Sequence, residues 1–264
     1  MSAEVAPAPN IWLRFPSRVS TFCIVELQKL SHDRTELFTR AVQPILWLVV
    51  FGETFNRIHA IPTGHVPYLD FLAPGVIAQS GLFVAIFYGI QIIWERDAGV
   101  LTKLLVTPTP RAALILGKSF AAGIRAFAQV IVVLIVSALL GVALSTNPAH
   151  ILGVLVVVVL GAAFFSCLSM TIAGVVLKRD RLMGIGQMIT MPLFFASNAL
   201  YPVSVMPPWL RVLNKVNPLS YEVDALRGLL IGTSDHLGLD FLVLVVAVIA
   251  GVITASSLVD RLAR

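Results

Sequence analysis

The chain has 264 residues, of which 58% are hydrophobic and 12% are charged, and its mean hydropathy is +0.91. A soluble domain carries about 25% charged residues, and a soluble fold of this size could not bury so much apolar surface. The composition therefore excludes a soluble globular protein and predicts an integral membrane protein. The net charge of +5 would suit either nucleic acid or a membrane surface, so the positions of the basic residues must decide between them.

The N-terminal region is predicted to contain a disordered tail and then an amphipathic helix. Residues 1–16 are rich in Ala and Pro and lack the basic, apolar and small-residue regions of a signal peptide. In residues 17–35, apolar side chains such as Val19, Phe22 and Leu27 recur at helical spacing while charged residues fall elsewhere. This segment is too short and too polar to span a membrane, so we expect it to lie at the interface or against a partner, with a plain soluble lead-in helix as the alternative.

Six apolar runs follow, each long enough to cross a membrane. Crossing a hydrocarbon core of about 30 Å takes about 20 residues at about 1.5 Å per residue. The runs are residues 37–55, 71–93, 121–144, 151–177, 182–200 and 239–259. None has the strict alternation of a barrel strand. The predicted fold class is therefore an all-α integral membrane protein, with six transmembrane helices in one domain of residues 36–264.

The basic residues predict the orientation. If both termini are cytoplasmic, fifteen of the 19 Lys and Arg residues fall on the inner side. The four on the outer side are Arg57, Arg211, Lys215 and Arg227. We therefore expect a multi-pass protein of a bacterial plasma (inner) membrane with both termini in the cytoplasm. The basic character then reflects this bias and anionic lipid headgroups, so nucleic acid is not an expected partner.

One charged segment, residues 94–111, lies between the second and third apolar runs, and we call it the elbow. It begins with an acidic and basic cluster, contains a glycine that allows a sharp turn, continues with a short leucine stripe and ends at a Thr-Pro repeat that breaks the helix. A solvated loop needs no leucine stripe, so the elbow is predicted to be a cytoplasmic coupling helix that docks another protein. The predicted coupling residues are Glu95, Arg96, Asp97, Gly99, Leu101, Leu104, Leu105, Thr107 and Pro108.

The segment between the fifth and sixth runs, residues 201–238, predicts two short amphipathic helices. Each has proline at its start and the second ends at a glycine. Because such helices cannot span, we expect them to re-enter the membrane or to cap the bundle on its outer side. Asp224 and Arg227 are spaced i,i+3 and are expected to form a structural ion pair, with a substrate gate as the alternative. The residues assigned to this outer gate are Pro208, Trp209, Asn217, Pro218, Tyr221, Arg227 and Gly232.

Polar and aromatic side chains inside the runs are the candidates for a substrate path. The candidates are Glu53, Gln79, Phe83, Phe87 and Asn198. Polar side chains in lipid usually hydrogen-bond a neighbouring helix, and that simpler role is expected for most of them. Glu53 can either pair with Arg57 at i,i+4 or contact a cation or lipid headgroup. The five histidines and two cysteines show no ligand spacing, so no metal site is expected.

Two motifs carry a resemblance to a known family. The pattern E-R-[DE]-x-G-x-L-x-x-L-x-x-T-P at Glu95–Pro108 occurs together with P-x-W-L…N-P-L-S-Y…L-R-G-L-L-x-G at Pro207–Gly232. The combination resembles the permease subunit of ABC-2 type exporters, in particular the daunorubicin-resistance-like drug and lipid branch. Asp97 stands where Glu is common in that family, and Val100 stands where Thr is common, which removes a possible hydroxyl contact.

The resemblance implies a function and a set of partners. The interface helix and the coupling helix would contact a separate nucleotide-binding ATPase subunit, and the outer re-entrant helices would close the extracellular side. Two permease subunits, identical or homologous, would work with two ATPases to export amphipathic drugs or lipids from among the membrane lipids. Export of a lipid-linked polysaccharide or glycolipid is the alternative.

The chain itself is not expected to bind nucleotide. Gly117, Lys118 and Ser119 resemble the end of a phosphate loop, but that loop requires Gly at position 112, where Ala112 stands. Lys118 is then more simply a basic anchor on the inner side. We therefore expect no cofactor in this chain, with ATP and Mg²⁺ bound by the partner ATPase. An intramembrane enzyme is excluded because the apolar runs hold no Ser/His, paired-Asp or His-rich constellation.

Overall fold

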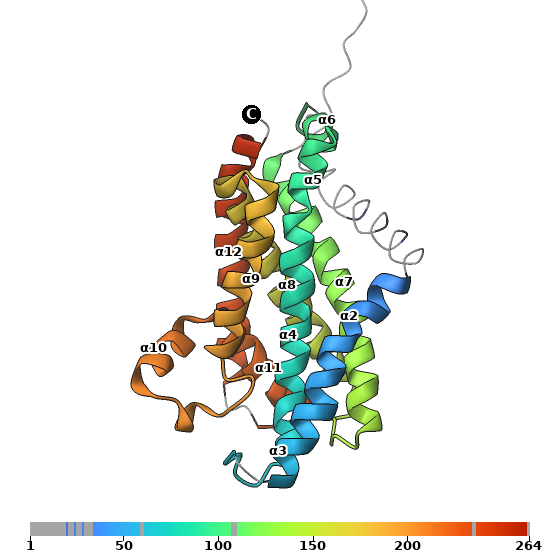
Figure 1. Cartoon of the computed structure of the whole chain (residues 1–264), viewed down its shortest axis with the longest axis vertical. Coiled ribbons are helices and arrows are strands. Elements are labelled where there is room, and N and C mark those ends of the chain that lie inside the picture. The colour runs from blue at the N-terminus through green and yellow to red at the C-terminus, as the bar shows by residue number, and fades with distance from the viewer. Residues whose placement is uncertain are drawn as a thin grey trace, which may run out of the picture.

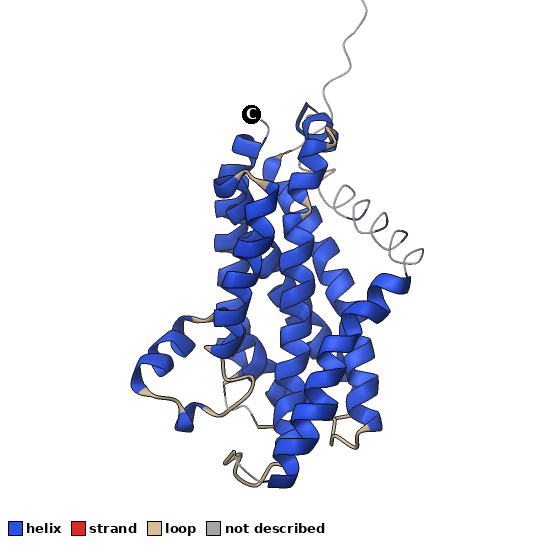
Figure 2. Ribbon diagram, in the orientation of Figure 1, coloured by secondary structure: helices blue, strands red, loops and turns tan. Residues whose placement is uncertain are grey.

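A computed structural model of the chain describes residues 34–58, 61–106, 110–233 and 236–262, together with three isolated positions, Ser20, Ile24 and Gln28. Its elements are all helices, and no strand occurs in these ranges (Figure 2). The predicted all-helical fold is therefore confirmed. The predicted N-terminal tail and nearly all of the predicted interface helix lie outside the described residues.

Four helical stretches in the described part of the chain are long and apolar enough to cross a membrane. They are α4 (Tyr68–Ile90) with its continuation α5 (Ile92–Asp97), α7 (Arg111–Leu139), α8 (Pro148–Val176) and the Leu237–Val259 part of α12 (Leu237–Leu262). The α8 helix packs against α4, α7 and α12, and the long helices run side by side as one bundle (Figure 1). This arrangement supports a multi-pass membrane protein.

The boundaries of the third predicted span differ from those in the structure. The run was expected at residues 121–144, whereas α7 begins directly after Pro110 and ends at Leu139. Proline fits a helix start because its missing N–H needs no partner there. The chain leaves the helix at Gly141, which has a positive φ of 80°.

The first and fifth predicted spans are helical, but they are shorter or interrupted. Over the first, α2 (Arg34–Leu46), the π-helix η1 (Trp47–Gly52) and α3 (Glu53–Ile58) follow one another without a break. Pro44 lies inside α2 and cannot donate to the helical ladder, which favours the change of helical pitch that follows. Over the fifth, α9 (Arg179–Phe195) has 17 residues and ends shortly after Pro192.

The two short helices predicted after the fifth run are present. They are α10 (Pro208–Val216) and α11 (Pro218–Ile231), preceded by the 3₁₀ turn η2 (Val203–Val205). The α11 helix packs against α4, α8 and α12, whereas α10 projects from the side of the bundle (Figure 1). One helix of the pair is therefore part of the core.

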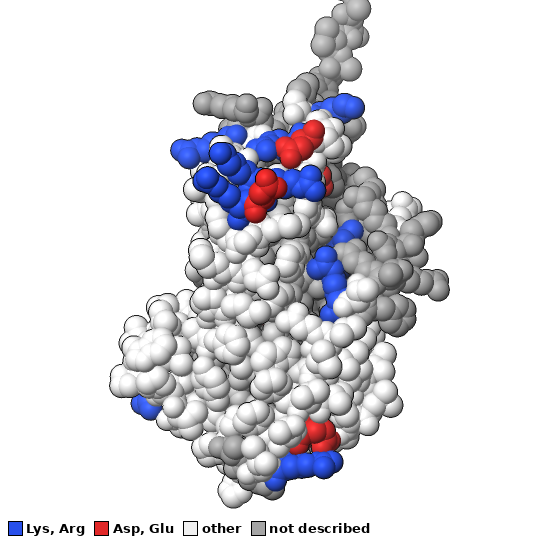
Figure 3. Space-filling view, viewed as in Figure 1, with Lys and Arg blue, Asp and Glu red and all other residues white. Residues whose placement is uncertain are grey.

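The two ends of the bundle differ in charge. One end carries α5, α6 (Val100–Val106), the turn between α8 and α9 and the end of α12, and we call it the elbow end. Lys and Arg side chains gather at the elbow end, while the opposite end, near α3 and α10, shows few of them on the visible face (Figure 3). On the same visible face, the middle of the bundle presents mainly uncharged side chains, as a surface in contact with lipid tails requires (Figure 3).

Candidate functional site

The elbow is built as two short helices joined by a glycine turn. The α5 helix ends at Asp97, α6 begins at Val100, and Gly99 between them has a φ of 70°. A residue with a Cβ adopts this left-handed conformation only at a cost, so the sharp turn predicted at Gly99 is confirmed.

The charged residues of the elbow are tied to the rest of the bundle. Glu95 forms an ion pair with Lys118 of α7, whose side chain is only 8% exposed. Arg96 donates to the backbone carbonyl of Leu177 at 3.0 Å, in the turn between α8 and α9, and also pairs with Asp97 at 2.8 Å. Lys118 is thus a buried partner of the elbow, a contact that the sequence did not predict, and its role as a basic anchor on the inner side stays a prediction.

Two leucines of the elbow's stripe, Leu101 and Leu104, face its own bundle. Leu101 is fully buried in the main core and Leu104 packs against that core, partly buried. We predicted that Leu101 forms part of an outward docking surface, but its apolar side chain is buried within its own chain. Among the side chains of α6 that the structure describes, those of Val100, Thr102 and Lys103 are exposed.

Three further coupling residues cannot be placed in the same way. The side chain of Leu105 and the whole of Thr107 and Pro108 lie outside the described residues. Their role in coupling stays a prediction.

Arg227 joins α11 to the start of α4 and to the segment that follows α9. Its guanidinium donates to the carbonyl of Asn198 at 2.6 Å and to that of Phe71 at 3.4 Å, and it lies 3.7 Å from the centre of the Phe71 ring. It also forms the predicted ion pair with Asp224, at 3.5 Å, and Asp224 accepts a hydrogen bond from Asn198 at 2.6 Å. The ion pair expected at i,i+3 is therefore present, and the Asn198 side chain contacts it, away from the cavity described below.

The ends of the two outer helices follow the predicted signals. Pro208 and Pro218 occupy the first turns of α10 and α11, and Gly232 ends α11 with a φ of 70°. Asn217 caps α11 by accepting from the N–H of Leu219 at 3.1 Å. The same side chain donates to a carbonyl of α9, which joins α11 to that helix.

Two of the residues assigned to the outer gate, Tyr221 and Trp209, differ in their surroundings. The Tyr221 hydroxyl donates to the carbonyl of Lys215 at 2.7 Å and so fastens α11 to α10. Trp209 is 65% exposed on α10. An exposed tryptophan on a projecting helix suits the boundary between lipid and water.

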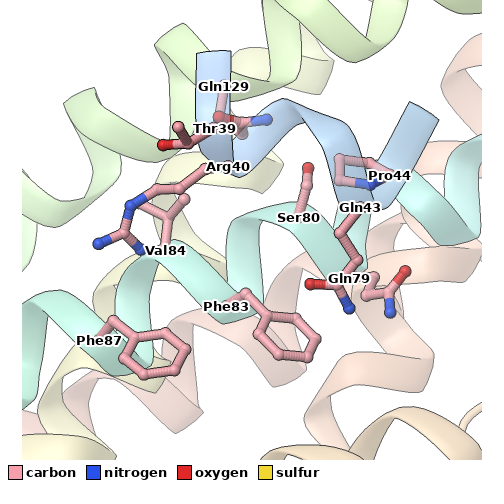
Figure 4. Close-up of a pocket in the computed structure, with 10 residues that line it drawn as sticks. All are labelled: Thr39, Arg40, Gln43, Pro44, Gln79, Ser80, Phe83, Val84, Phe87 and Gln129. Carbon is pink, nitrogen blue, oxygen red and sulfur yellow. The ribbon is translucent and has the colours of Figure 1, made fainter. Parts of the chain in front are cut away.

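A cavity of about 230 Å³ lies between α2, α4 and α7 (Figure 4). It contains three of the five residues predicted for a substrate path, Gln79, Phe83 and Phe87, all on α4. The remaining lining residues are Thr39, Arg40, Gln43, Pro44, Ser80, Val84 and Gln129. Arg40 and Gln129 were not among the residues predicted for a substrate path.

Two of the amides in this cavity, those of Gln79 and Gln129, are buried and have no partner in the part of the chain that the structure describes. Gln79 is 2% exposed and Gln129 is 1% exposed, and among the described residues neither their side-chain nitrogens nor their oxygens have a hydrogen-bond partner. The simpler role expected for them, a hydrogen bond to a neighbouring helix, is therefore not what the structure has. Leaving such a group unsatisfied costs about 1–3 kcal/mol, which a polar group of a bound molecule would recover.

The other side chains of the cavity combine aromatic surface with positive charge. The rings of Phe83 and Phe87 are stacked with their centres 6.4 Å apart, and the Arg40 guanidinium lies 5.7 Å from the centre of the Phe87 ring. Aromatic faces, amides and one guanidinium in a small cavity suit a molecule with an apolar body and a polar or acidic group.

Glu53 lies away from this cavity, in α3 at the end of the bundle opposite the elbow. It forms an ion pair with Arg57 at 3.6 Å, and both side chains are substantially exposed. The i,i+4 pair expected as one alternative is confirmed. In the described ranges no group of three or more His, Cys, Asp or Glu side chains could hold a metal ion.

Comparison with known proteins identifies the family. Residues 19–231 match the description of the ABC-2 type transporter family. The chain belongs to this family. The resemblance inferred from the elbow and outer-helix motifs is thereby confirmed.

Individual relatives include named permeases. The chain is 32% identical to the putative transport permease ycf38 of Porphyra purpurea over 196 residues, which cover 72% of this chain and 66% of that protein. It is 24% identical to the daunorubicin resistance ABC transporter permease protein DrrB1 of Streptomyces coeruleorubidus, over 79% of this chain and 73% of that protein. It is 26% identical to nodulation protein J of Rhizobium leguminosarum bv. trifolii, over 74% of each.

Proposed function

We propose that this chain is the transmembrane permease subunit of an ATP-binding-cassette exporter, which moves amphipathic drugs or lipids out across a bacterial plasma membrane. The work is supplied by ATP hydrolysis, with ATP and Mg²⁺ bound by a separate ATPase subunit and no cofactor in this chain. The observation that carries the proposal is the elbow: a charged turn at the basic end of an ABC-2 family bundle, linked by Glu95 to α7 and by Arg96 to the turn between α8 and α9.

The proposed topology has six crossings, with both termini and the elbow in the cytoplasm and α10 and α11 on the outer side. The α9 helix supports this because it must return the chain from the elbow end, where Arg179 lies over Trp94, toward the start of α12 at the other end. The segment from α2 to α3 also follows the depth of the bundle. Arg40 lies over Phe87 in the half of α4 nearer the elbow, and Phe55 lies 5.8 Å from Tyr68 at the opposite end.

The path from the elbow to the cavity is short. The α5 helix is separated from α4 only by Gln91, so a displacement of the elbow acts directly on the helix that carries Gln79, Phe83 and Phe87. The Glu95–Lys118 pair carries the same displacement to α7, which contributes Gln129 to the opposite wall. Movement of a docked ATPase would therefore change the spacing of two cavity walls together.

The cargo is proposed from the chemistry of the cavity. A volume of about 230 Å³ lined by phenylalanines, glutamines and Arg40 suits part of an amphipathic drug or lipid better than a polysaccharide. Relatives named for daunorubicin and doxorubicin resistance are in keeping with this choice. A second permease subunit, identical or homologous, and the surrounding lipids would complete the transport path.

The test is association with an ATPase, using the exposed face of α6. The ATPase subunit that co-purifies with the chain from membranes of its host would be identified, and the complex would be assayed for ATPase stimulation by drugs, lipids and glycans. Lys103→Glu reverses an exposed charge on the elbow, and Lys215→Glu makes the same change on α10 as a matched control. We expect Lys103→Glu to reduce co-purification and Lys215→Glu to preserve it; equal recovery from both variants, or no ATPase in the wild-type preparation, would refute the proposed coupling.

A further inference from the structure

One acidic residue of α11 has no role in the sites described above. Glu222 is fully buried, and its carboxyl lies against two glycines, Gly161 of α8 and Gly81 of α4. A Cβ placed on Gly161 would overlap the carboxyl itself, and a Cβ on Gly81 would lie 3.8 Å from Oε1. The two glycines thus form a notch that admits a carboxyl group between α4 and α8.

The notch lies near the middle of the membrane. Gly81 is the fourteenth of the 30 residues of the stretch Tyr68–Asp97, and Gly161 is the fourteenth of the 29 residues of α8. Both are therefore close to the centres of helices that cross the bilayer. Since α11 enters the bundle from one end only, it carries Glu222 to about half the depth of the hydrocarbon core.

The carboxyl of Glu222 is unpartnered among the residues that the structure places. Within the described ranges, neither Oε1 nor Oε2 of Glu222 has a hydrogen-bond donor. Its helix packs against α4, α8 and α12. The titratable groups on these helices and on α11 itself are Tyr68, Asp70, Tyr88, His150, Cys167, Tyr221, Asp224, Arg227, Asp240, Asp260 and Arg261. Arg227, the cation nearest in sequence, is engaged with Asp224 and with the carbonyls of Asn198 and Phe71.

The surroundings of Glu222 decide its protonation state. The α8 helix contains no Lys, Arg, Asp or Glu, and α4 contains none between Asp70 and its end at Ile90. An ionised carboxylate without a cation or donor in such surroundings costs many kcal/mol, whereas the neutral acid costs far less. In the packed arrangement the side chain therefore carries a proton.

We propose that Glu222 is a proton-binding site at the centre of the permease, protonated while α11 is packed against α4 and α8 and deprotonated when α11 leaves the notch. On release the O–H bond of the acid breaks, the proton passes to water entering from the outer side, and the carboxylate remains on α11. Glu222 must bind a proton again before α11 repacks, because burying the ionised carboxylate in the notch costs too much free energy. The proton site itself is independent of the proposed transport function, but its link to opening of the outer side rests on that function.

The proton site can be tested without transport. Infrared spectra of the purified permease in lipid at alkaline pH, where exposed carboxyls are ionised, would show the carbonyl-stretch band of a protonated acid. We expect the band in the wild type and in Glu53→Gln, which removes an exposed carboxyl, and its loss in Glu222→Gln. Glu222→Asp should keep a protonated acid with a shifted band. Absence of the band from the wild type, or its persistence in Glu222→Gln, would overturn the proposal. A spectrum showing that Glu222 is ionised and binds sodium or potassium would also overturn it.

The link to opening is tested in the complex with the ATPase. The stimulated ATPase rate of Glu222→Gln divided by that of the wild type, measured at a series of pH values, cancels the pH dependence of the ATPase itself. We expect a ratio that is constant at acidic pH, where glutamine mimics the protonated acid, and that changes with a single-proton dependence as the pH rises. A ratio that is flat at all pH values, together with the infrared band, would retain the proton site and refute its link to transport. Failure of the proposed function would instead appear as no ATPase partner for the wild type.

Discussion

Replacement of Arg227 by methionine should unlock α11 from the outer end of the bundle. The Arg227 side chain is 8% exposed, and its guanidinium holds together α11, the start of α4 and the segment after α9. Methionine keeps a long side chain but removes this guanidinium. The perturbation therefore removes one side chain that joins three segments distant in sequence.

The magnitude follows from the contacts that are lost. The 2.6 Å bond to the carbonyl of Asn198 is worth about 1.5–3 kcal/mol as a hydrogen bond from a charged donor, and the desolvated contact with the Phe71 ring is worth about 2 kcal/mol. The ion pair adds little because the Asp224 side chain is 43% exposed. The expected loss is about 3–5 kcal/mol, and at about 2–4 °C per kcal/mol this is a fall in Tm of roughly 6–20 °C.

The assay is thermal unfolding of the purified permease in one detergent, followed by tryptophan fluorescence. Arg211→Met is the matched control, because Arg211 of α10 also donates to two carbonyls, those of Met206 at 2.8 Å and Ser204 at 2.9 Å, but both lie in the segment directly before its own helix. Its expected cost is about 1 kcal/mol. Arg227→Lys keeps the charge without the planar donor fork and should fall between wild type and Arg227→Met. If the Tm of Arg227→Met is no lower than that of Arg211→Met, the guanidinium of Arg227 does not stabilise the bundle by joining its three segments, and the reasoning is refuted.

Three further predictions test the elbow, the topology and the cavity. Glu95→Gln and Lys118→Gln should each weaken cargo-stimulated ATPase, and the double variant should show a coupling energy of about 1–3 kcal/mol in the cycle; additive effects would mean that the pair does not act as a unit. In a cysteine-less background, a cysteine at Ser204 should react with an impermeant reagent from outside and one at Thr102 only from inside, and the opposite result would exclude the proposed orientation. Gln79→Leu should raise thermal stability by about 1–2 kcal/mol, because it removes an unsatisfied buried amide, while lowering stimulation by cargo; unchanged stimulation would remove Gln79 from the substrate path.

The sequence by itself determined the class of fold, the turn in the elbow and the ends of the two short outer helices. Long apolar runs require helices in lipid, and short-range signals set the turn at Gly99, the starts of α10 and α11 at Pro208 and Pro218, and the end of α11 at Gly232. The ion pairs Glu53–Arg57 and Asp224–Arg227 were likewise predictable. Each depends on residues within about one helical turn, so the information is local.

Only the tertiary structure decided which side chains meet across helices. In the structure, Leu101 is buried in the core and Lys118 forms an ion pair with Glu95. Gln129 and Gln79 line the same cavity, and Glu222 lies against Gly161. In a soluble helix a polar face would reveal which side is buried, but helices such as α8 are apolar on every side because one face meets lipid and the other meets protein. Small residues and polar groups then select the neighbouring helix through packing, and that selection depends on residues far apart in the chain.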